Sequence, residues 1–242
     1  MASSGHTVKA FDEDLTDLRG LVSEMGGLAE QAISASLQAL VNRDLDGAAR
    51  IVESDKRVDE IEAEIELQVV RLIALRAPMA DDLRDVLAAL KIANIIERIA
   101  DYAKNIAKRV PIVSETQAIE PLSILPAMGR LAAEMVRDAL DAFAARDAEA
   151  AVAVCGRDRA VDDFYNSLFR TLLTYMMENP HNISPSTHLL FIAKNLERIG
   201  DHATNVAEMV YFAATGRQMA ERPRGEDAFG QLDDLDEKGG TR

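Results

Sequence analysis

The chain carries Glu97-Arg-Ile-Ala-Asp101-Tyr-Ala-Lys-Asn105-Ile-Ala, and 100 residues later it carries Glu197-Arg-Ile-Gly-Asp201-His-Ala-Thr-Asn205-Val-Ala. Three shorter matches precede this repeat at a common offset of 103 residues: Asp55-Lys-Arg-Val-Asp59 with Asp158-Arg-Ala-Val-Asp162, Arg43-Asp44 with Arg146-Asp147, and Met25-Gly26 with Met128-Gly129. Four matches in the same order indicate that one structural unit occurs twice along the chain.

The apolar residues around these repeats recur with the 3.6-residue period of a helix. They predict six helices near residues 8–44, 47–76, 81–109, 121–145, 148–178 and 185–215, separated by short polar or proline-containing turns. Short turns favour antiparallel neighbours. We therefore expect an all-α fold of two tandem, pseudo-symmetric three-helix bundles. The expected boundaries are 8–110 for the first bundle, 111–120 for a linker, 121–217 for the second bundle and 218–242 for a disordered acidic tail.

The composition narrows the class of protein. The net charge of −14 argues against nucleic-acid binding, which needs a basic stripe facing the phosphates. A single cysteine, Cys155, cannot form an internal disulfide and is typical of a reducing compartment. No run of about 18 apolar residues is present, and the N-terminus lacks the apolar core of a signal peptide. We expect a cytoplasmic protein without direct membrane insertion.

Acidic residues of the repeats align on single helix faces. At about 100° per residue, Glu97 and Asp101 lie one turn apart, opposite an isoleucine-rich face, and Asn105 follows one turn later. The second unit repeats the pattern with Glu197, Asp201 and Asn205. The helix before each of these carries a matching pair of acids, Asp55 with Asp59 and Asp158 with Asp162.

Such rows of carboxylates predict a cation. Like charges one turn apart repel by roughly 0.2–0.5 kcal/mol, and two facing rows repel more unless positive charge lies between them. Oxygen ligands suit hard ions such as Mg²⁺, Mn²⁺, Ca²⁺ or iron. One alternative is a solvated face whose acids pair with Lys56, Arg57, Arg98, Lys104 and Arg198. The occurrence of four such rows of acids, at equivalent positions of the two units, favours the cation site.

Catalytic signatures are not found in the sequence. One Glu-x-x-His match, Glu178-Asn-Pro-His181, falls on a predicted proline turn and not inside a helix as in di-iron bundles. His202 points about 100° away from Asp201. The sequence also contains no glycine-rich phosphate loop and no nucleophile elbow. We therefore expect a protein that is not an enzyme.

The doubled Glu-Arg-Ile-[Ala/Gly]-Asp-x-Ala-x-Asn strip resembles the PhoU family of phosphate-system regulators. The resemblance runs from about Ala10 to Arg217 and includes Met25-Gly-Gly27 and Met79-Ala-Asp-Asp-Leu-Arg84. It implies two three-helix bundles with metal, divalent or multinuclear (Mg, Mn, Fe or Zn), on the carboxylate motifs. Transferred to this chain, the implied ligands are Asp55, Asp59, Glu97, Asp101, Asp158, Asp162, Glu197 and Asp201, with Asn105 and Asn205 as further candidates.

The resemblance also implies a role and partners. PhoU-like proteins restrain the phosphate ABC transporter and help to keep the phosphate-starvation regulon off when phosphate is plentiful. The expected partners are the transporter's ATPase subunit and the phosphate sensor histidine kinase, which would place the protein at the inner membrane peripherally. A homodimer is also expected, since dimers are common in the family.

Three alternatives stay open at this stage. The carboxylate rows could activate metal-bound water in a phosphoesterase. The chain could be a passive helical scaffold, or a PhoU-like regulator of another ion transporter. Alanine substitution across both units separates these readings, because a hydrolase loses turnover and a regulator loses control of signalling.

Overall fold

The computed structural model describes residues 4–115 and 124–219, with side chains from residue 11 onwards. Helices form almost all of this part of the chain, and it contains no strand. The helices are α1 (Ser4–Asn42), α2 (Leu45–Arg76), α3 (Asp81–Ala107), α4 (Val110–Ser114), α5 (Leu125–Ala145), α6 (Ala148–Cys155), α7 (Asp158–Glu178) and α8 (Ile183–Thr215), with the 3₁₀ turn η2 (Pro180–Asn182) before α8.

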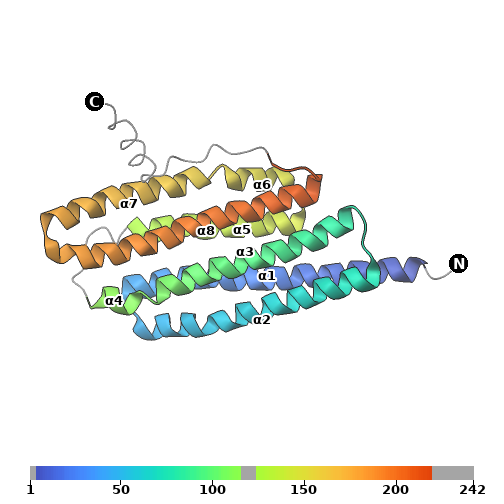
Figure 1. The fold of residues 1–242 in the computed structure, drawn as a ribbon, viewed down its shortest axis with the longest axis horizontal. Helices are drawn as coiled ribbons and strands as arrows, with labels where there is room; N and C mark the ends of the chain where they lie inside the picture. The colour runs from blue at the N-terminus through green and yellow to red at the C-terminus, as the bar shows by residue number, and fades with distance from the viewer. Residues whose placement is uncertain (1–3, 116–123, 220–242) are drawn as a thin grey trace, which may run out of the picture.

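The helices form two similar units. In the first, α1, α2 and α3 pack against one another, and in the second α8 packs against α5, α6 and α7. The units meet through α3 on α8 and α1 on α5. Figure 1 shows the α2–α3 turn and the α7–α8 turn at opposite ends of the molecule, so α3 and α8 run antiparallel. The predicted fold of two pseudo-symmetric three-helix bundles is confirmed.

The predicted helix boundaries need two refinements. The single helix expected over residues 148–178 is interrupted at Gly156 and Arg157, which separate α6 from α7. Part of the expected linker is helical, since α4 spans Val110–Ser114. Residues 116–120 of that linker, the expected helical residues 121–123 and all but the first two residues of the expected tail lie outside the described residues.

The first turn of each unit is built in the same way. Arg43 and Arg146 adopt left-handed conformations, with φ of 54° and 55°, which end α1 and α5. Asp44 then caps α2 by accepting a hydrogen bond from the Gly47 amide, and Asp147 caps α6 in the same manner. In each unit, the arginine of the Arg-Asp pair therefore ends one helix, and the aspartate caps the start of the next.

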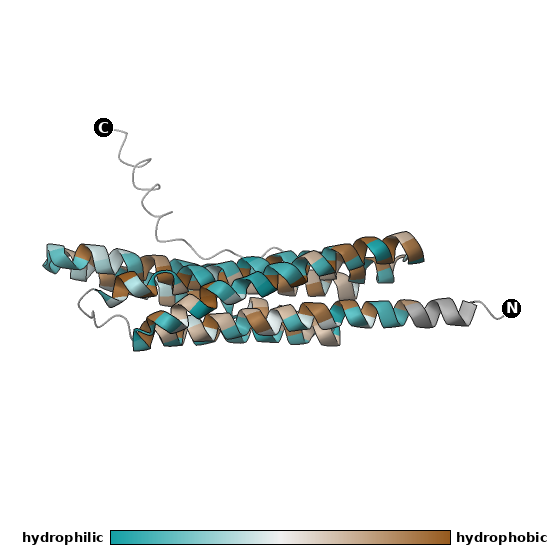
Figure 2. Ribbon diagram, turned by 90° about the horizontal axis from the view of Figure 1, so that it is seen from below, coloured by the Kyte–Doolittle hydropathy of each residue, from teal (hydrophilic) through white to brown (hydrophobic). Residues whose placement is uncertain are grey.

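The apolar faces predicted from the periodicity form the core. On α3, Ile92, Ile96, Ile99 and Ile106 are fully buried, and on α8 Leu196, Ile199 and Ala203 are as well. Figure 2 shows hydrophilic and hydrophobic residues alternating along the helices, as amphipathic packing requires.

Two glycines allow the units to approach closely. A Cβ at Gly26 would lie 2.3 Å from Leu140 Cδ1, and one at Gly129 would lie 2.1 Å from Leu37 Cδ1. Gly26 and Gly129 are equivalent residues of the repeat, and so are Leu37 and Leu140. The α1–α5 contact therefore obeys a local two-fold symmetry, in which each glycine receives the leucine of the other unit.

The α3–α8 contact has the same symmetry. Tyr102 and His202 occupy equivalent positions, and their rings meet edge to face with centroids 5.2 Å apart. A residue that touches its own counterpart lies beside the pseudo-two-fold axis. His202 thus belongs to the contact between the units, in agreement with its predicted position away from the acidic strip.

Candidate functional site

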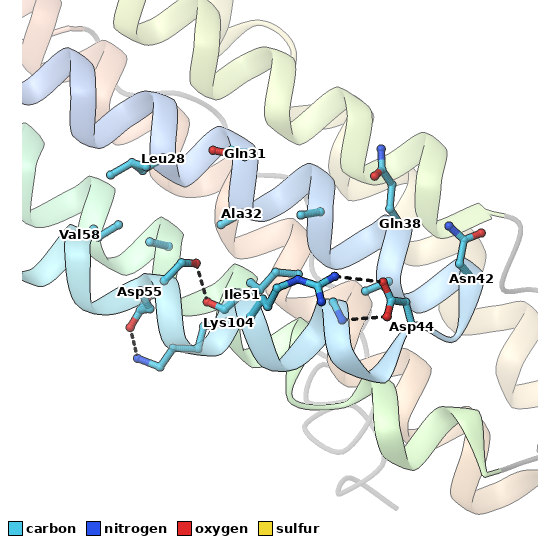
Figure 3. Close-up of a pocket in the computed structure, with 16 residues that line it drawn as sticks. Leu28, Gln31, Ala32, Gln38, Asn42, Asp44, Ile51, Asp55, Val58 and Lys104 are labelled. Carbon is cyan, nitrogen blue, oxygen red and sulfur yellow. Dashed lines mark hydrogen bonds and ion pairs between the residues drawn. The ribbon is translucent and has the colours of Figure 1, made fainter.

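The first carboxylate cluster lies between α2 and α3. Lys104 Nζ lies 2.7 Å from Asp101 Oδ1 and also forms an ion pair with Asp55 Oδ2 (Figure 3). Asp55 is buried, with 8% of its surface exposed. Burial lowers the pKa of Lys104, but its hydrogen bonds to Asp101 and Asp55 outweigh this effect and raise it above its ordinary value. The lysine is therefore held in its charged form between the two acids.

The other acids of this cluster are more exposed. Glu97 is half-buried, and its pKa is raised to about 7 by burial, by the charges of Asp101 and Glu62 and by a hydrogen bond to Asp101, against the opposing effect of Arg98. Asp59 is exposed, and its pKa is raised by partial burial and by the charge of Asp55. Asn105 is exposed at the end of the strip.

The second cluster lies between α7 and α8. Burial raises the pKa of Asp201 to about 7, and the charges of Glu197, Asp158 and Asp162 add to the effect, while Lys194 opposes it. Three carboxylates of α7 and α8 thus act on Asp201 through their charges. Asp158, Asp162 and Asn205 are half-buried.

Glu197 is the most deeply placed acid of the second cluster. Only 6% of its surface is exposed. Its Oε1 accepts a hydrogen bond from Lys194 at 2.6 Å, while its Oε2 is buried and has no hydrogen-bond partner among the described residues. A buried carboxylate oxygen without a donor is energetically costly, so this atom is suited to a cation.

The structure brings the predicted acids together in two groups, one per unit, because α2 packs on α3 and α7 on α8. Within the described residues, no three His, Cys, Asp or Glu side chains converge closely enough to hold a metal ion in the present rotamers. Sequence reasoning missed the role of Lys194. Its spacing of three residues before Glu197 is the signal that could have shown the pair.

A cleft adjoins the first cluster. It has a volume of about 390 Å³, lies among α1, α2 and α3, and includes Asp55 and Lys104 in its lining (Figure 3). At the equivalent place in the second unit, Arg157 of the α6–α7 connection forms ion pairs with Glu134 and Asp138 of α5. The first unit has the shorter Ser54 at the position of Arg157.

Known proteins share this arrangement. Residues 22–110 and 125–210 each match the PhoU domain. The chain belongs to the PhoU family. It is 62% identical over 223 residues to the phosphate-specific transport system accessory protein PhoU homolog of Zymomonas mobilis, covering 92% of this chain and 94% of that protein. The corresponding homolog of Caulobacter vibrioides is 47% identical over 221 residues, covering 90% of this chain and 96% of that protein.

Solved structures of PhoU proteins have the same fold as this chain. PhoU from Pseudomonas aeruginosa superimposes with a TM-score of 0.82 at 36% identity, over 86% of this chain and 100% of that one. The phosphate transport system regulatory protein PhoU from Streptococcus pneumoniae gives 0.81 at 30% identity, over 87% of this chain and 100% of that one. Among the described residues, no helix is long and apolar enough to cross a membrane.

Proposed function

We propose that this chain is a regulatory accessory protein of phosphate transport that represses the phosphate-starvation response when phosphate is plentiful. The observation that carries the proposal is the match along nine-tenths of the chain to relatives named as accessory proteins of the phosphate-specific transport system. The doubled bundle and its two acidic clusters supply the physical basis, because they offer charged surfaces without a catalytic constellation.

The proposed mechanism is docking. The partners are the ATPase subunit of the phosphate ABC transporter and the phosphate sensor histidine kinase, both reached from the cytoplasm, with the chain acting as a homodimer. The net charge of −14 supports contact with basic surfaces, since complementary charge speeds encounter and excludes wrong partners. No substrate turnover is involved.

The proposed cofactor is a divalent or multinuclear metal on the carboxylate strips, with Mg, Mn, Fe and Zn as candidates. The donor set fits, because Asp, Glu and Asn supply oxygen ligands and the buried Oε2 of Glu197 has no hydrogen-bond partner within residues 4–115 and 124–219. Asp55, Asp59, Glu97, Asp101 and Asn105 would contribute in the first unit; Asp158, Asp162, Glu197, Asp201 and Asn205 would contribute in the second. Bound metal would supply the charge that offsets the repulsion among these acids.

The test is alkaline phosphatase output in phosphate-rich medium. We expect deletion of the gene to raise the output and the wild-type chain to restore repression. The variant with Glu97, Asp101, Glu197 and Asp201 changed to Ala should fail to restore it. A control variant with the exposed acids Asp12, Asp17, Glu64 and Glu178 changed to Ala should behave as wild type, since it removes equal charge outside the strips.

An output that stays flat on deletion would contradict the regulatory proposal. If the four-residue strip variant represses as well as wild type, the acidic strips are not needed for regulation. Immunoblots of both variants ensure that equal amounts of protein are compared.

A further inference from the structure

One side of α3 carries a row of basic residues that is separate from the acidic clusters. At about 100° per residue, Arg84, Lys91 and Arg98 lie within roughly 40° of one another around the helix, and Tyr102 lies in the same arc. Lys91 and Arg98 are exposed, and Arg84 pairs with Asp81 of its own helix at 2.5 Å. The row therefore presents positive charge along one side of α3.

This row borders α8, where the two units meet. A Cβ at Gly216, just past the end of α8, would lie 3.3 Å from Arg84 Cζ. Beyond the other end of α3, Arg109 places its guanidinium 4.3 Å from the centroid of the Phe191 ring of α8. Together with the ring contact between the units described above, these contacts place the row beside the seam at which α3 and α8 lie side by side (Figure 1).

The α8 side of the seam adds positive charge. Arg198, the equivalent of Arg98, lies over the Tyr102 ring at 5.8 Å from its centroid. Phe191 and Met209 share this arc of α8, and within the two helices, both fully described, neither this arc nor its α3 counterpart contains an acid. In a chain with a net charge of −14, the seam thus carries a basic strip, which consists of Arg84, Lys91, Arg98, Arg109 and Arg198.

The sequence places an acidic segment shortly after this strip ends. The chain leaves α8 at Gly216, beside the first arginine of the strip. Residues 225–237, which lie outside the described residues, contain six acids and no basic residue. They also contain three large apolar residues, Phe229, Leu232 and Leu235. This composition complements a surface of guanidinium groups and partly exposed aromatic rings.

We propose that residues 225–237 dock onto the basic strip of the same chain and screen it from other anionic partners. The tether has a suitable length. Asp233 follows Met219 by 14 residues, and a chain of that length without secondary structure has a root-mean-square span of about 20 Å. The 14 residues of helix from Arg84 to Arg98 span about 21 Å. Covalent connection also gives the segment an effective concentration in the millimolar range at the strip.

An extended anionic surface fits the strip less well than a single segment does. The strip is as narrow as the seam, and on the opposite flank of each helix lies a row of carboxylates, with Glu97 and Asp101 on α3 and Glu197 and Asp201 on α8. A nucleic acid or a lipid surface would meet these rows and be repelled. A single acidic segment along the seam avoids them.

The first test measures the distance between the segment and the strip in the purified full chain. Spin labels are attached to Gln231→Cys and to Asn94→Cys, an exposed position near the strip, after Cys155→Ala removes the native thiol. We expect double electron–electron resonance to give a narrow distribution of short distances at low salt. High salt should broaden it, because salt screens exposed ion pairs.

Matched variants of the labelled chain show whether the strip holds the segment. The strip variant Lys91→Gln, Arg98→Gln, Arg198→Gln should give the broad distribution even at low salt. The control variant Arg71→Gln, Arg130→Gln, Arg170→Gln removes the same charge from exposed positions elsewhere and should keep the narrow distribution.

The second test uses a fluorescent synthetic peptide of residues 225–237. The tail variant Asp233→Asn, Asp234→Asn, Asp236→Asn, Glu237→Gln should bind this peptide at least tenfold more tightly than the wild type, because the wild-type segment competes for the strip. Adding the three strip substitutions to the tail variant should abolish binding.

Three results would overturn the proposal. They are a broad distance distribution for the labelled chain at low salt, equal binding of the peptide by the wild type and the tail variant, and a distance signal that arises only between separately labelled chains. The last result would assign the segment to the strip of a second copy. None of these measurements depends on phosphate regulation, so their outcome is separate from that of the alkaline phosphatase assay.

Discussion

At the scale of single residues, the environment of each acid depends on what packs beside it. Asp101 and Asp201 are equivalent in the repeat. Burial raises the pKa of Asp201 to about 7, and the charge of Glu197 adds to this effect. Asp101 has Lys104 within hydrogen-bond distance. The repeat thus places Lys104 three residues after Asp101, and Thr204 three residues after Asp201.

The raised pKa values predict a pH dependence of stability for the metal-free protein. Glu97 and Asp201 have pKa values of about 7 in the fold, against ordinary values of 4.5 and 3.8. At pH values between the ordinary and the raised pKa of each acid, the folded state binds more protons than the unfolded state. The stability of the fold therefore falls as pH rises through this range and is greatest below it. We expect the Tm measured in chelator to be higher at pH 5.5 than at pH 7.5 for this reason.

The control for this prediction is Glu97→Gln with Asp201→Asn, which removes both titrations. Relative to that variant, the wild type should lose stability between pH 5.5 and 7.5. Groups distant from Glu97 and Asp201 titrate alike in both proteins, so the difference between their Tm curves reports these two acids and the neighbours coupled to them. Parallel curves would show that these carboxyls do not titrate abnormally.

At the scale of helices, the approach of α1 to α5 depends on glycine. Gly26 and Gly129 each accept a leucine from the opposite unit, and a methyl group there would collide with it. By contrast, Gly27 is exposed and has no atom within 4 Å of a Cβ. Neighbouring glycines of α1 therefore have different roles, one in packing and one on the surface.

We predict opposite effects for two glycine substitutions. Gly27→Ala should stabilise the protein by about 0.5–1 kcal/mol, because alanine has the higher helix propensity. Gly129→Ala should gain the same propensity but lose about 1–3 kcal/mol through overpacking against Leu37. Chemical denaturation measures both, and adding Leu37→Ala to Gly129→Ala should relieve the clash. Equal stabilisation by both alanines would mean that the interface adjusts freely.

At the scale of the whole molecule, Asp85 connects the two units. It is 3% exposed and pairs with Arg19 of its own unit at 2.7 Å and with Arg146 of the second unit at 3.1 Å. Burial raises the pKa of Asp85, and the two arginines oppose that shift. A buried carboxylate at such a junction depends on its partners.

We predict that the double variant Arg19→Ala, Arg146→Ala loses roughly 2–4 kcal/mol of unfolding free energy, because it leaves Asp85 buried and unpaired. A further change, Asp85→Asn, should restore part of the loss by removing the buried charge. Urea denaturation of the three proteins checks this. A double variant that unfolds at the wild-type midpoint would show that Asp85 reaches solvent or another partner.

Much of the fold could be predicted because its signals are local. Helical periodicity, turn residues and the offsets of 100 and 103 residues determined the helices, their order and the doubling of the unit. The two Arg-Asp turns could be predicted because the same dipeptide occurs in both units. The break at Gly156 was missed because the apolar period continues across it. The acidic strips were also predictable, because residues four apart share one face of a helix.

The sequence by itself thus determined two three-helix units and the acids that line their helix faces. Only the tertiary structure decided that Lys104 lies between Asp101 and Asp55, which is 49 residues away from Lys104. It also decided that one oxygen of Glu197 is buried and has no hydrogen-bond partner in the part of the chain that the structure describes. It also decided that equivalent residues, Tyr102 and His202, touch at the contact between the units. The physical reason is that helix formation depends on neighbours along the chain, whereas burial and ion pairing depend on which distant helices pack together.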